Sequence, residues 1–285
     1  MKYTYTKEYN TSYSYIDRTG KLGLVELMNI NQDMITEFCG SIGSDNLILR
    51  EKNNAAWIYT RTKVKINSLP VWNTKTKAVA FFSALSPIRA EIEVDLLGEG
   101  GEILFAAKTE MCVIDFVNRK VVKIDTVEFP KDVECLPSNI TEPFTKPKTV
   151  FEPGDLRYSQ IVYPCDTDFT EHTNNVRYVK YIMNTLDASF FSEKMVRDFE
   201  IHFTKESRAG DVLDIYRKDW GCADAGVSGS SEGAGAEAGA ESVCCCEDAS
   251  AGEAACCENG AGKYSFVIKN GEVAVVKIEM EYENA

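Results

Sequence analysis

Apolar and polar residues follow the same order twice along this chain. Between residues 22 and 38 the apolar residues recur at helical spacing, and a second stretch with this property runs from about Asn174 to Phe191. Each is preceded by a strand-like segment and a turn, one at Asp17 and the other at Asp168. The pattern predicts two helices in equivalent places of an internal repeat. The stripe of the first consists of Leu24, Leu27, Met28, Met34, Ile35 and Phe38.

Segments typical of strands follow each predicted helix. They are expected at 57–66, 74–85, 90–97, 103–116 and 121–124 in the first half, and at 199–204, 212–216, 264–268 and 273–283 in the second. The Asn270-Gly271 pair between the last two is typical of a hairpin turn. A long helix followed by antiparallel strands, occurring twice, predicts an α+β fold of two tandem hotdog domains.

Four prolines, at positions 137, 143, 147 and 153, suggest where the two domains join. Such a stretch favours an extended connector. We therefore expect an amino-terminal domain at 1–136, a linker at 137–153 and a carboxy-terminal domain at 154–285.

Residues 223–262 have a different composition from the rest, rich in Ala, Gly, Ser and Glu and nearly free of large apolar residues. Such a segment cannot bury enough apolar surface to offset the entropy lost on ordering, so we interpret it as a disordered insertion. It contains clusters at Cys244–Cys246 and Cys256–Cys257. The cluster spacing matches no zinc motif and includes no histidine, so we expect neither a metal site nor a cofactor.

Charge and hydropathy exclude two classes of partner. The net charge of the 285 residues is −13, which argues against nucleic acid, and no apolar run is long enough for a membrane helix. The first twenty residues lack the apolar core of a signal peptide, so we expect a cytoplasmic protein whose cysteines are reduced thiols.

The segment Asp168–Tyr178, DFTEHTNNVRY, resembles the D-x-N-x-H-x-N-N-x-x-Y segment of plant and bacterial acyl-ACP thioesterases. The segments TEMCVIDFVNRK at 109–120 and FTKESRAGD at 203–211 are also similar to that family. The resemblance implies a double hotdog enzyme that hydrolyses fatty acyl thioesters of acyl carrier protein in fatty acid biosynthesis.

The resemblance also implies the catalytic residues. Asp168 and His172 match residues of the motif, Thr170 stands where the family usually has Asn, and Glu206 matches an acid proposed to activate water. Ser207 stands where plant members have a Cys. The proposed substrate-binding residues are Asn174, Asn175 and Arg177, of which the two asparagines also suit a helix cap or turn.

Thioester hydrolysis needs an activated water and stabilisation of the oxyanion that develops on the carbonyl. The second helix begins close to His172, so its free amides can supply the oxyanion site. Aligning the two halves places Lys21 at the position of His172 and Asn67 near that of Glu206. We therefore expect one active site, in the second domain, with the first domain shaping the acyl pocket.

Several alternatives remain open at this stage. Strict strand alternation from Phe199 would place His202 on the same face as Glu206, although we interpret His202 as a satisfied strand residue. An acyl-CoA thioesterase and a non-catalytic acyl-binding protein fit the same pattern, whereas a hotdog dehydratase fits less well because Asp187 lies far along the helix. Acyl chain length is undetermined, and the protein could be a monomer or a homodimer.

Overall fold

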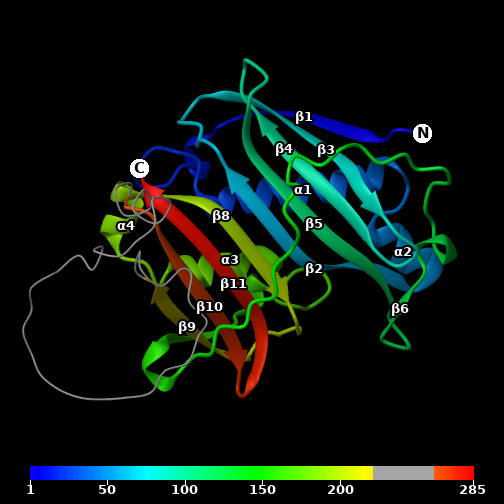
Figure 1. Cartoon of the computed structure of the whole chain (residues 1–285). Coiled ribbons are helices and arrows are strands. Elements are labelled where there is room, and N and C mark those ends of the chain that lie inside the picture. Colours follow the sequence, from blue (N-terminus) through cyan, green and yellow to red (C-terminus); the bar gives the residue numbers. More distant parts are fainter. Residues whose placement is uncertain (221–259) are drawn as a thin grey trace, which may run out of the picture.

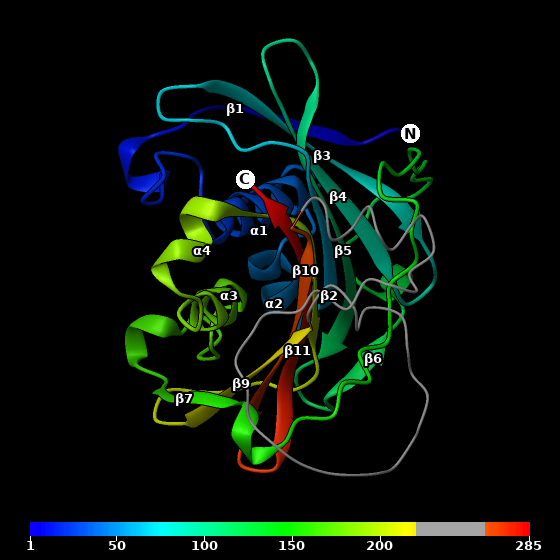
Figure 2. The same cartoon turned by 60° about the vertical axis from the view of Figure 1, so that its left-hand side comes forward.

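The structure, a computed structural model, describes residues 1–220 and 260–285. Helices pack on one face of a single antiparallel sheet, and the other face carries the extended segment that joins the two halves (Figures 1 and 2). Among the described residues, no helix has the length and apolar character that a bilayer crossing requires. The predicted insertion at 223–262 lies outside the described residues, apart from its last three.

The first half contains two helices, α1 (Leu24–Ser41) and α2 (Asn46–Asn53). Its strands are β1 (Thr4–Asn10), β2 (Ala55–Ile66), β3 (Lys75–Leu85), β4 (Ala90–Leu97), β5 (Ile103–Asp115) and β6 (Lys120–Val122). The second half contains α3 (Asn175–Met183) and α4 (Ala188–Glu193). Its strands are β7 (Leu156–Ile161), β8 (Lys194–Phe203), β9 (Val212–Trp220), β10 (Gly262–Asn270) and β11 (Val273–Asn284).

The order of strands confirms the internal repeat. The first half runs β1-β3-β4-β5-β2 across the sheet, with β6 beside β5, and the second half runs β7-β9-β10-β11-β8 in mirror order. The halves join where β2 pairs antiparallel with β8, with Thr62 opposite Ile201. Each half consists of a helical segment packed against its own five or six strands of the shared sheet. The prediction of an α+β fold with two tandem hotdog units is therefore confirmed.

The second predicted helix is wrong as a continuous element, because it is broken between α3 and α4. Asn184, Thr185 and Asp187 occupy the break, and Thr185 Oγ1 donates a hydrogen bond back to the Ile182 carbonyl. Asn, Thr and Asp side chains compete with the helix for backbone hydrogen bonds, which explains the interruption.

Other predicted boundaries also change. In the strand-like segment predicted before Asp17, β1 ends at Asn10, and a short 3₁₀ turn follows at Tyr13–Tyr15. β8 begins at Lys194, five residues before its predicted start, and β10 begins at Gly262, inside the predicted insertion. The helix α2 was not predicted, although Asp45 caps it by accepting hydrogen bonds from the Leu47 and Ile48 amides.

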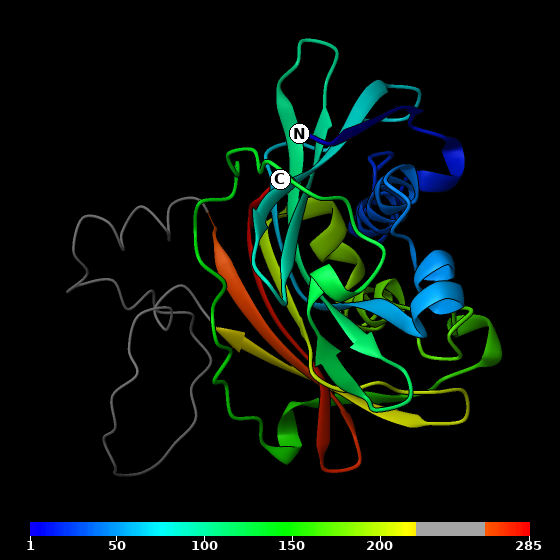
Figure 3. The same ribbon diagram turned by 90° about the vertical axis from the view of Figure 1, so that its right-hand side faces the viewer.

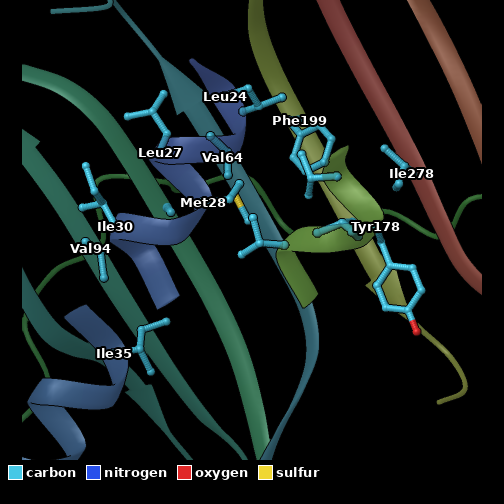
Figure 4. Close-up of a cluster of buried hydrophobic side chains, with 14 of the residues drawn as sticks. Leu24, Leu27, Met28, Ile30, Ile35, Val64, Val94, Tyr178, Phe199 and Ile278 are labelled. Carbon is cyan, nitrogen blue, oxygen red and sulfur yellow. The ribbon is translucent and has the colours of Figure 1, made fainter. Parts of the chain in front are cut away.

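The core lies between the helices and the inner face of the sheet. Figure 4 shows α1 residues such as Leu27 and Met28 against strand residues such as Val64 and Phe199, all of them buried. The apolar stripe predicted for α1 is confirmed, since all six of its residues are buried. Burial of such large side chains is the main stabilising contribution, roughly 1.5 to 3 kcal/mol for each.

The connector after β6 crosses the outer face of the sheet from the first half to the second (Figures 1 and 3). Its Asn139 amide donates to Glu93 at 2.6 Å, and Lys108 Nζ donates to the Ile140 carbonyl at 2.6 Å. Further along, the Thr145 amide donates to Glu200 at 2.7 Å. These contacts satisfy polar side chains of the outer face that the connector buries.

Candidate functional site

The segment from Asp168 to His172 forms a tight turn before α3. The Asp168 amide donates to the His172 carbonyl at 2.9 Å, and Glu171 adopts a left-handed conformation with φ of 64°. Asp168 Oδ1 accepts two hydrogen bonds from Thr170, from the backbone amide at 2.8 Å and from Oγ1 at 2.5 Å. The carboxylate of Asp168 therefore orders the turn and orients the Thr170 hydroxyl.

His172 continues this chain of hydrogen bonds. Its Nδ1 lies 3.0 Å from Thr170 Oγ1, whose own proton goes to Asp168. Thr170 Oγ1 must therefore accept from Nδ1–H, and this places a proton on Nδ1. The other ring nitrogen, Nε2, lies 3.1 Å from Nη2 of Arg208. Because a guanidinium can only donate, this contact requires an unprotonated Nε2.

Glu206 lies just beyond the end of β8, on the same side of His172 as Arg208. Its Oε2 is 3.1 Å from His172 Nε2 and 2.5 Å from Nη2 of Arg119. The contact with His172 becomes a hydrogen bond when Nε2 carries a proton. Oε1 of Glu206 has no hydrogen-bond partner among the described residues. The site thus combines an imidazole whose Nε2 faces both Arg208 and Glu206 with a carboxylate that has one free oxygen.

These groups border a cavity of about 700 Å³ between the two halves of the chain. Asp168, Thr170, His172 and Glu206 form the part contributed by the second half. The first half contributes a wall with an apolar part from α1, β2, β5 and the turn after β5, which includes Ile35, Ala56, Trp57, Ile58, Tyr59, Met111, Ile114 and Phe116. The polar residues of this wall are Gln32, Asp33, Thr36, Glu37, Asp45, Asn46 and Arg119. The volume lies in the range of small-molecule sites in proteins, and the lining suits an apolar ligand with one reactive polar end.

The start of α3 borders the same cavity. Asn174 Oδ1 accepts a hydrogen bond from the Val176 amide at 2.9 Å, so the interpretation of Asn174 as a helix cap is confirmed. Asn175 lines the cavity, and neither its amide N–H nor its side chain has a partner within the described residues. Arg177 does not line the cavity and instead faces Asp166, with its Nε 3.7 Å from Oδ1.

Two potential nucleophiles near the cavity are occupied or inactive. Ser207 is buried, and its Oγ lies 2.6 Å from Thr173 Oγ1 and 2.8 Å from the Tyr178 hydroxyl. Cys39 lines the cavity, but burial raises the pKa of its thiol to about 12. A thiolate at that position is therefore negligible at neutral pH, and neither side chain is placed to attack a carbonyl.

The second histidine lies away from this cavity, on the outer face. His202 Nε2 is 2.6 Å from Glu200 Oε1, beneath the connector, which confirms its interpretation as a satisfied strand residue. The expectation that an unbulged strand would bring His202 and Glu206 to one face is wrong, because β8 ends at Phe203 and the chain turns before Glu206.

The first half contains a structural copy of the turn from Asp168 to His172. Asp17 Oδ1 accepts from the Thr19 amide at 2.8 Å and from its Oγ1 at 2.5 Å, and the Asp17 amide donates to the Lys21 carbonyl at 2.8 Å. Lys21 therefore stands where His172 stands in the second half, as predicted.

The predicted counterpart of Glu206 in the first half is wrong by two residues. The Leu22 amide donates to the Pro70 carbonyl, just as the Thr173 amide donates to the Ser207 carbonyl. These matching bonds place Leu69, and not Asn67, at the position of Glu206. The first half thus has a lysine and a leucine in place of the histidine and glutamate.

Two arginines of this site, Arg208 and Arg119, were not predicted from the sequence. Arg208 lies two positions after Glu206, and this proximity in sequence was a usable signal. Arg119 belongs to the turn after β5, and it reaches Glu206 across 87 positions in sequence. No local pattern predicts that contact, because it depends on how the two halves pack.

The fold and this site define the chain as a double hotdog protein with an aspartate, threonine, histidine and glutamate cluster on the border of a cavity between its two halves. Family models agree with this class: residues 2–129 match the acyl-ACP thioesterase N-terminal domain, and residues 156–246 match the acyl-ACP thioesterase C-terminal domain. The chain belongs to the acyl-ACP thioesterase family.

Two plant proteins are among its relatives in sequence. A chloroplastic acyl-[acyl-carrier-protein] hydrolase of Cuphea viscosissima is 24% identical over 212 residues, covering 70% of this chain and 50% of the relative. The chloroplastic dodecanoyl-[acyl-carrier-protein] hydrolase of Cinnamomum camphora is 23% identical over 206 residues, covering 67% of this chain and 53% of the relative. The chain spans about half the length of these relatives.

Solved structures show the same fold over nearly the whole chain. The 12:0-ACP thioesterase from Umbellularia californica superposes with a TM-score of 0.72 at 15% identity, covering 99% of this chain and 94% of the other. An acyl-ACP thioesterase from Bacteroides thetaiotaomicron gives a TM-score of 0.70 at 17% identity, covering 98% of each chain.

Proposed function

We propose that this protein hydrolyses the thioester of fatty acyl groups carried by acyl carrier protein and so releases free fatty acids. The observation that carries the proposal is the position of His172 and Glu206, 3.1 Å apart, on the border of a cavity whose wall is partly apolar. A long acyl chain would occupy the apolar part, and its thioester would lie beside the two polar groups. Membership of the acyl-ACP thioesterase family supports this substrate class.

In the proposed reaction, Glu206 activates the water molecule. Arg119 donates a hydrogen bond to its Oε2, which leaves Oε1 to accept a proton from water as the water oxygen attacks the thioester carbonyl carbon. The tetrahedral intermediate then breaks its carbon–sulfur bond, and the thiolate takes the proton from Glu206. A thiol is a good leaving group, so no strong general acid is required.

His172 keeps the reacting groups in place. Asp168 and Thr170 orient its ring, and Nε2 receives a hydrogen bond from Arg208 or, when protonated, donates one to Glu206. The ring thus helps to position Glu206, which carries the proton from water to the leaving sulfur. The unpaired Asn175 amide at the positive end of α3 is the proposed donor to the oxyanion.

In this proposal the two domains have different roles. The domain at 1–136 supplies the apolar wall and Arg119, the domain at 154–285 supplies the catalytic cluster, and the linker at 137–153 joins them. Acyl carrier protein has an acidic surface, so docking would use local bases such as Arg177 and Lys180 near the site. A cytoplasmic location remains a prediction, and the oligomeric state stays open between monomer and homodimer.

The test is steady-state hydrolysis of a series of acyl-ACPs and matching acyl-CoAs by the wild type, His172→Ala and Glu206→Gln. We expect the wild type to prefer acyl-ACP. Each variant should lose about a hundredfold or more in kcat/KM, because each removes a group that moves or positions the proton.

Two controls isolate the site. Glu171→Gln changes an exposed carboxylate in the same turn, and His202→Ala removes the other histidine, with folding checked by thermal melt in every variant. Both should stay within about threefold of wild type. Preference for acyl-CoA would contradict the proposed carrier. Binding of acyl-ACP without turnover would contradict the enzyme and favour a non-catalytic acyl-binding protein.

A further inference from the structure

A second cavity, of about 260 Å³, lies at the opposite end of the molecule from the candidate active site. The turn before α1, the first residues of α1, and the region of α4 and the start of β8 surround it, and these elements lie together in Figures 1 and 2. Most of its lining is apolar, and includes Ile16, Leu24, Ile66, Leu69, Met183, Phe190, Phe191 and Val196.

This cavity is the counterpart of the catalytic cavity under the internal repeat. Asp17, Thr19, Lys21 and Leu69 border it at the positions that Asp168, Thr170, His172 and Glu206 hold in the other. The far wall is equivalent as well, because the Ala285 amide bonds to the Glu193 carbonyl as the Phe116 amide bonds to the Asn54 carbonyl. The apolar pocket is thus retained, whereas the two titrating groups are replaced.

Among the described residues that border this cavity, Lys21 is the one charged side chain that has neither a hydrogen bond nor an ion pair. Asp17 is held by Thr19, and Glu26 Oε2 accepts a hydrogen bond from Asn29 at 2.8 Å. Lys194 Nζ donates to Asn284 Oδ1 at 2.6 Å and to the Gly260 carbonyl at 3.2 Å. Lys21 is partly buried and has no carboxylate within salt-bridge distance and no hydrogen bond in the described part of the chain. The ammonium therefore lacks a counter-ion beside an apolar pocket.

We propose that this second cavity binds a fatty acid, with the acyl chain in the apolar pocket and the carboxylate paired with Lys21. An amphiphile with an anionic end fits this cavity, because it offers apolar surface and two ammonium groups, of Lys21 and Lys194, that have no carboxylate partner. The carboxylates of Asp17 and Glu26, which also border it, accept hydrogen bonds from Thr19 and Asn29. The choice of a fatty acid rests on the proposed function, since hydrolysis would generate that molecule at the equivalent cavity. No hydrolysis is expected there, because lysine and leucine replace histidine and glutamate.

The experiment measures binding of carboxyl-¹³C-labelled decanoate, below its micelle concentration, by native mass spectrometry and by NMR of the carboxyl carbon. Wild type should bind two molecules per chain with two bound resonances. Lys21→Met keeps the apolar stem and removes the charge, so it should weaken one site about tenfold or more and leave the other unchanged. Lys21→Arg should retain both sites, and Lys77→Met, at an exposed lysine of β3, is the matched control.

Three results would overturn the proposal. The first is a single bound decanoate per chain that Lys21→Met does not weaken, and the second is two sites that are both insensitive to Lys21→Met. The third is equal loss in Lys21→Arg and Lys21→Met, which would show that the positive charge is irrelevant. Acyl-ACP hydrolysis is measured on the same preparations: if it is absent while Lys21-dependent binding persists, only the proposed function fails.

Discussion

Thr170 shows how one hydroxyl can replace the amide that the family usually has at this position. It accepts from His172 Nδ1 and donates to Asp168, so the ring is fixed with Nε2 directed toward Glu206 and Arg208. A hydroxyl suffices because it donates and accepts at the same time. We therefore predict that Thr170 is a positioning residue, which acts through His172.

Replacing Thr170 with Val should lower kcat/KM by roughly 10- to 100-fold and should change the pH profile of kcat, because the ring loses the partner that fixes its protonation and orientation. Thr170→Ser keeps the hydroxyl and should stay within about threefold of wild type. The measurement is the pH dependence of acyl-ACP hydrolysis.

The first half offers a matched control for this variant. Thr19→Val removes the same pair of bonds to Asp17, yet Lys21 and not a histidine follows it. It should leave catalysis unchanged. Equal losses in both variants would show that the hydroxyl only stabilises the turn, in contradiction to a role in positioning His172.

At the scale of elements, the connector determines which polar side chains on the outer face of the sheet are buried. β4 carries Glu93 and Asp95 into a region that Ser138 and Asn139 cover, and Asn139 Nδ2 donates to Asp95 at 2.8 Å. Burial, and then the neighbouring Glu93, raise the pKa of Asp95 to about 7. The connector therefore buries an acid that destabilises the fold once it is ionised.

The sign of the effect on stability follows from the raised pKa. Below pH 7 the folded state keeps a proton on Asp95 that the unfolded state has released, so this group favours unfolding progressively as pH rises from about 4 to 7. Asp95→Asn removes the titration. Relative to wild type, the variant should gain about 1 to 2 kcal/mol in unfolding free energy between pH 5 and pH 8.

Urea unfolding at the two pH values measures this difference, with Glu99→Gln as the control at an exposed acid. A difference between wild type and Asp95→Asn that does not change with pH would contradict the raised pKa. Comparison between variants is needed because other groups titrate in the same interval.

At the scale of the whole molecule, neither domain alone contains the candidate site. The turn from Asp168 to His172 belongs to the second half. The apolar part of the cavity wall and Arg119 belong to the first half. Arg119 sits in a left-handed turn with φ of 52°, and its guanidinium pairs with Glu206. The contact ties the packing of the two domains to the position of the proposed base.

Arg119→Asn keeps a residue that tolerates positive φ and removes the charge. The variant should lose about tenfold in kcat/KM with a melting temperature close to that of wild type, because Arg119 is half exposed and exposed ion pairs add little to stability. Lys120→Ala, at the adjacent position, is the control. Unchanged kcat/KM in Arg119→Asn would show that Glu206 is positioned without this arginine.

Local pattern was sufficient for the repeated helix-and-strand order, the α1 stripe from Leu24 to Phe38 and the family motif around His172, because periodicity and turn chemistry are properties of neighbouring residues. It was not sufficient for the break at Asn184–Asp187. There the apolar periodicity continues across the break, although several of the residues in the break are poor helix formers. Nor did it show that Leu69 occupies the position in the first half that is equivalent to Glu206 in the second. That equivalence depends on a hydrogen bond between loops that are distant in sequence.

The cavity, the Arg119 contact and the unpaired Lys21 were decided only by tertiary structure. Each depends on residues from different elements or different domains, whose distances in space have no signature in local sequence. The chain by itself therefore determined the fold class and predicted the residues of the candidate site. How those residues meet, and which charges remain without a partner, followed from the pairing of β2 with β8 that joins the two halves.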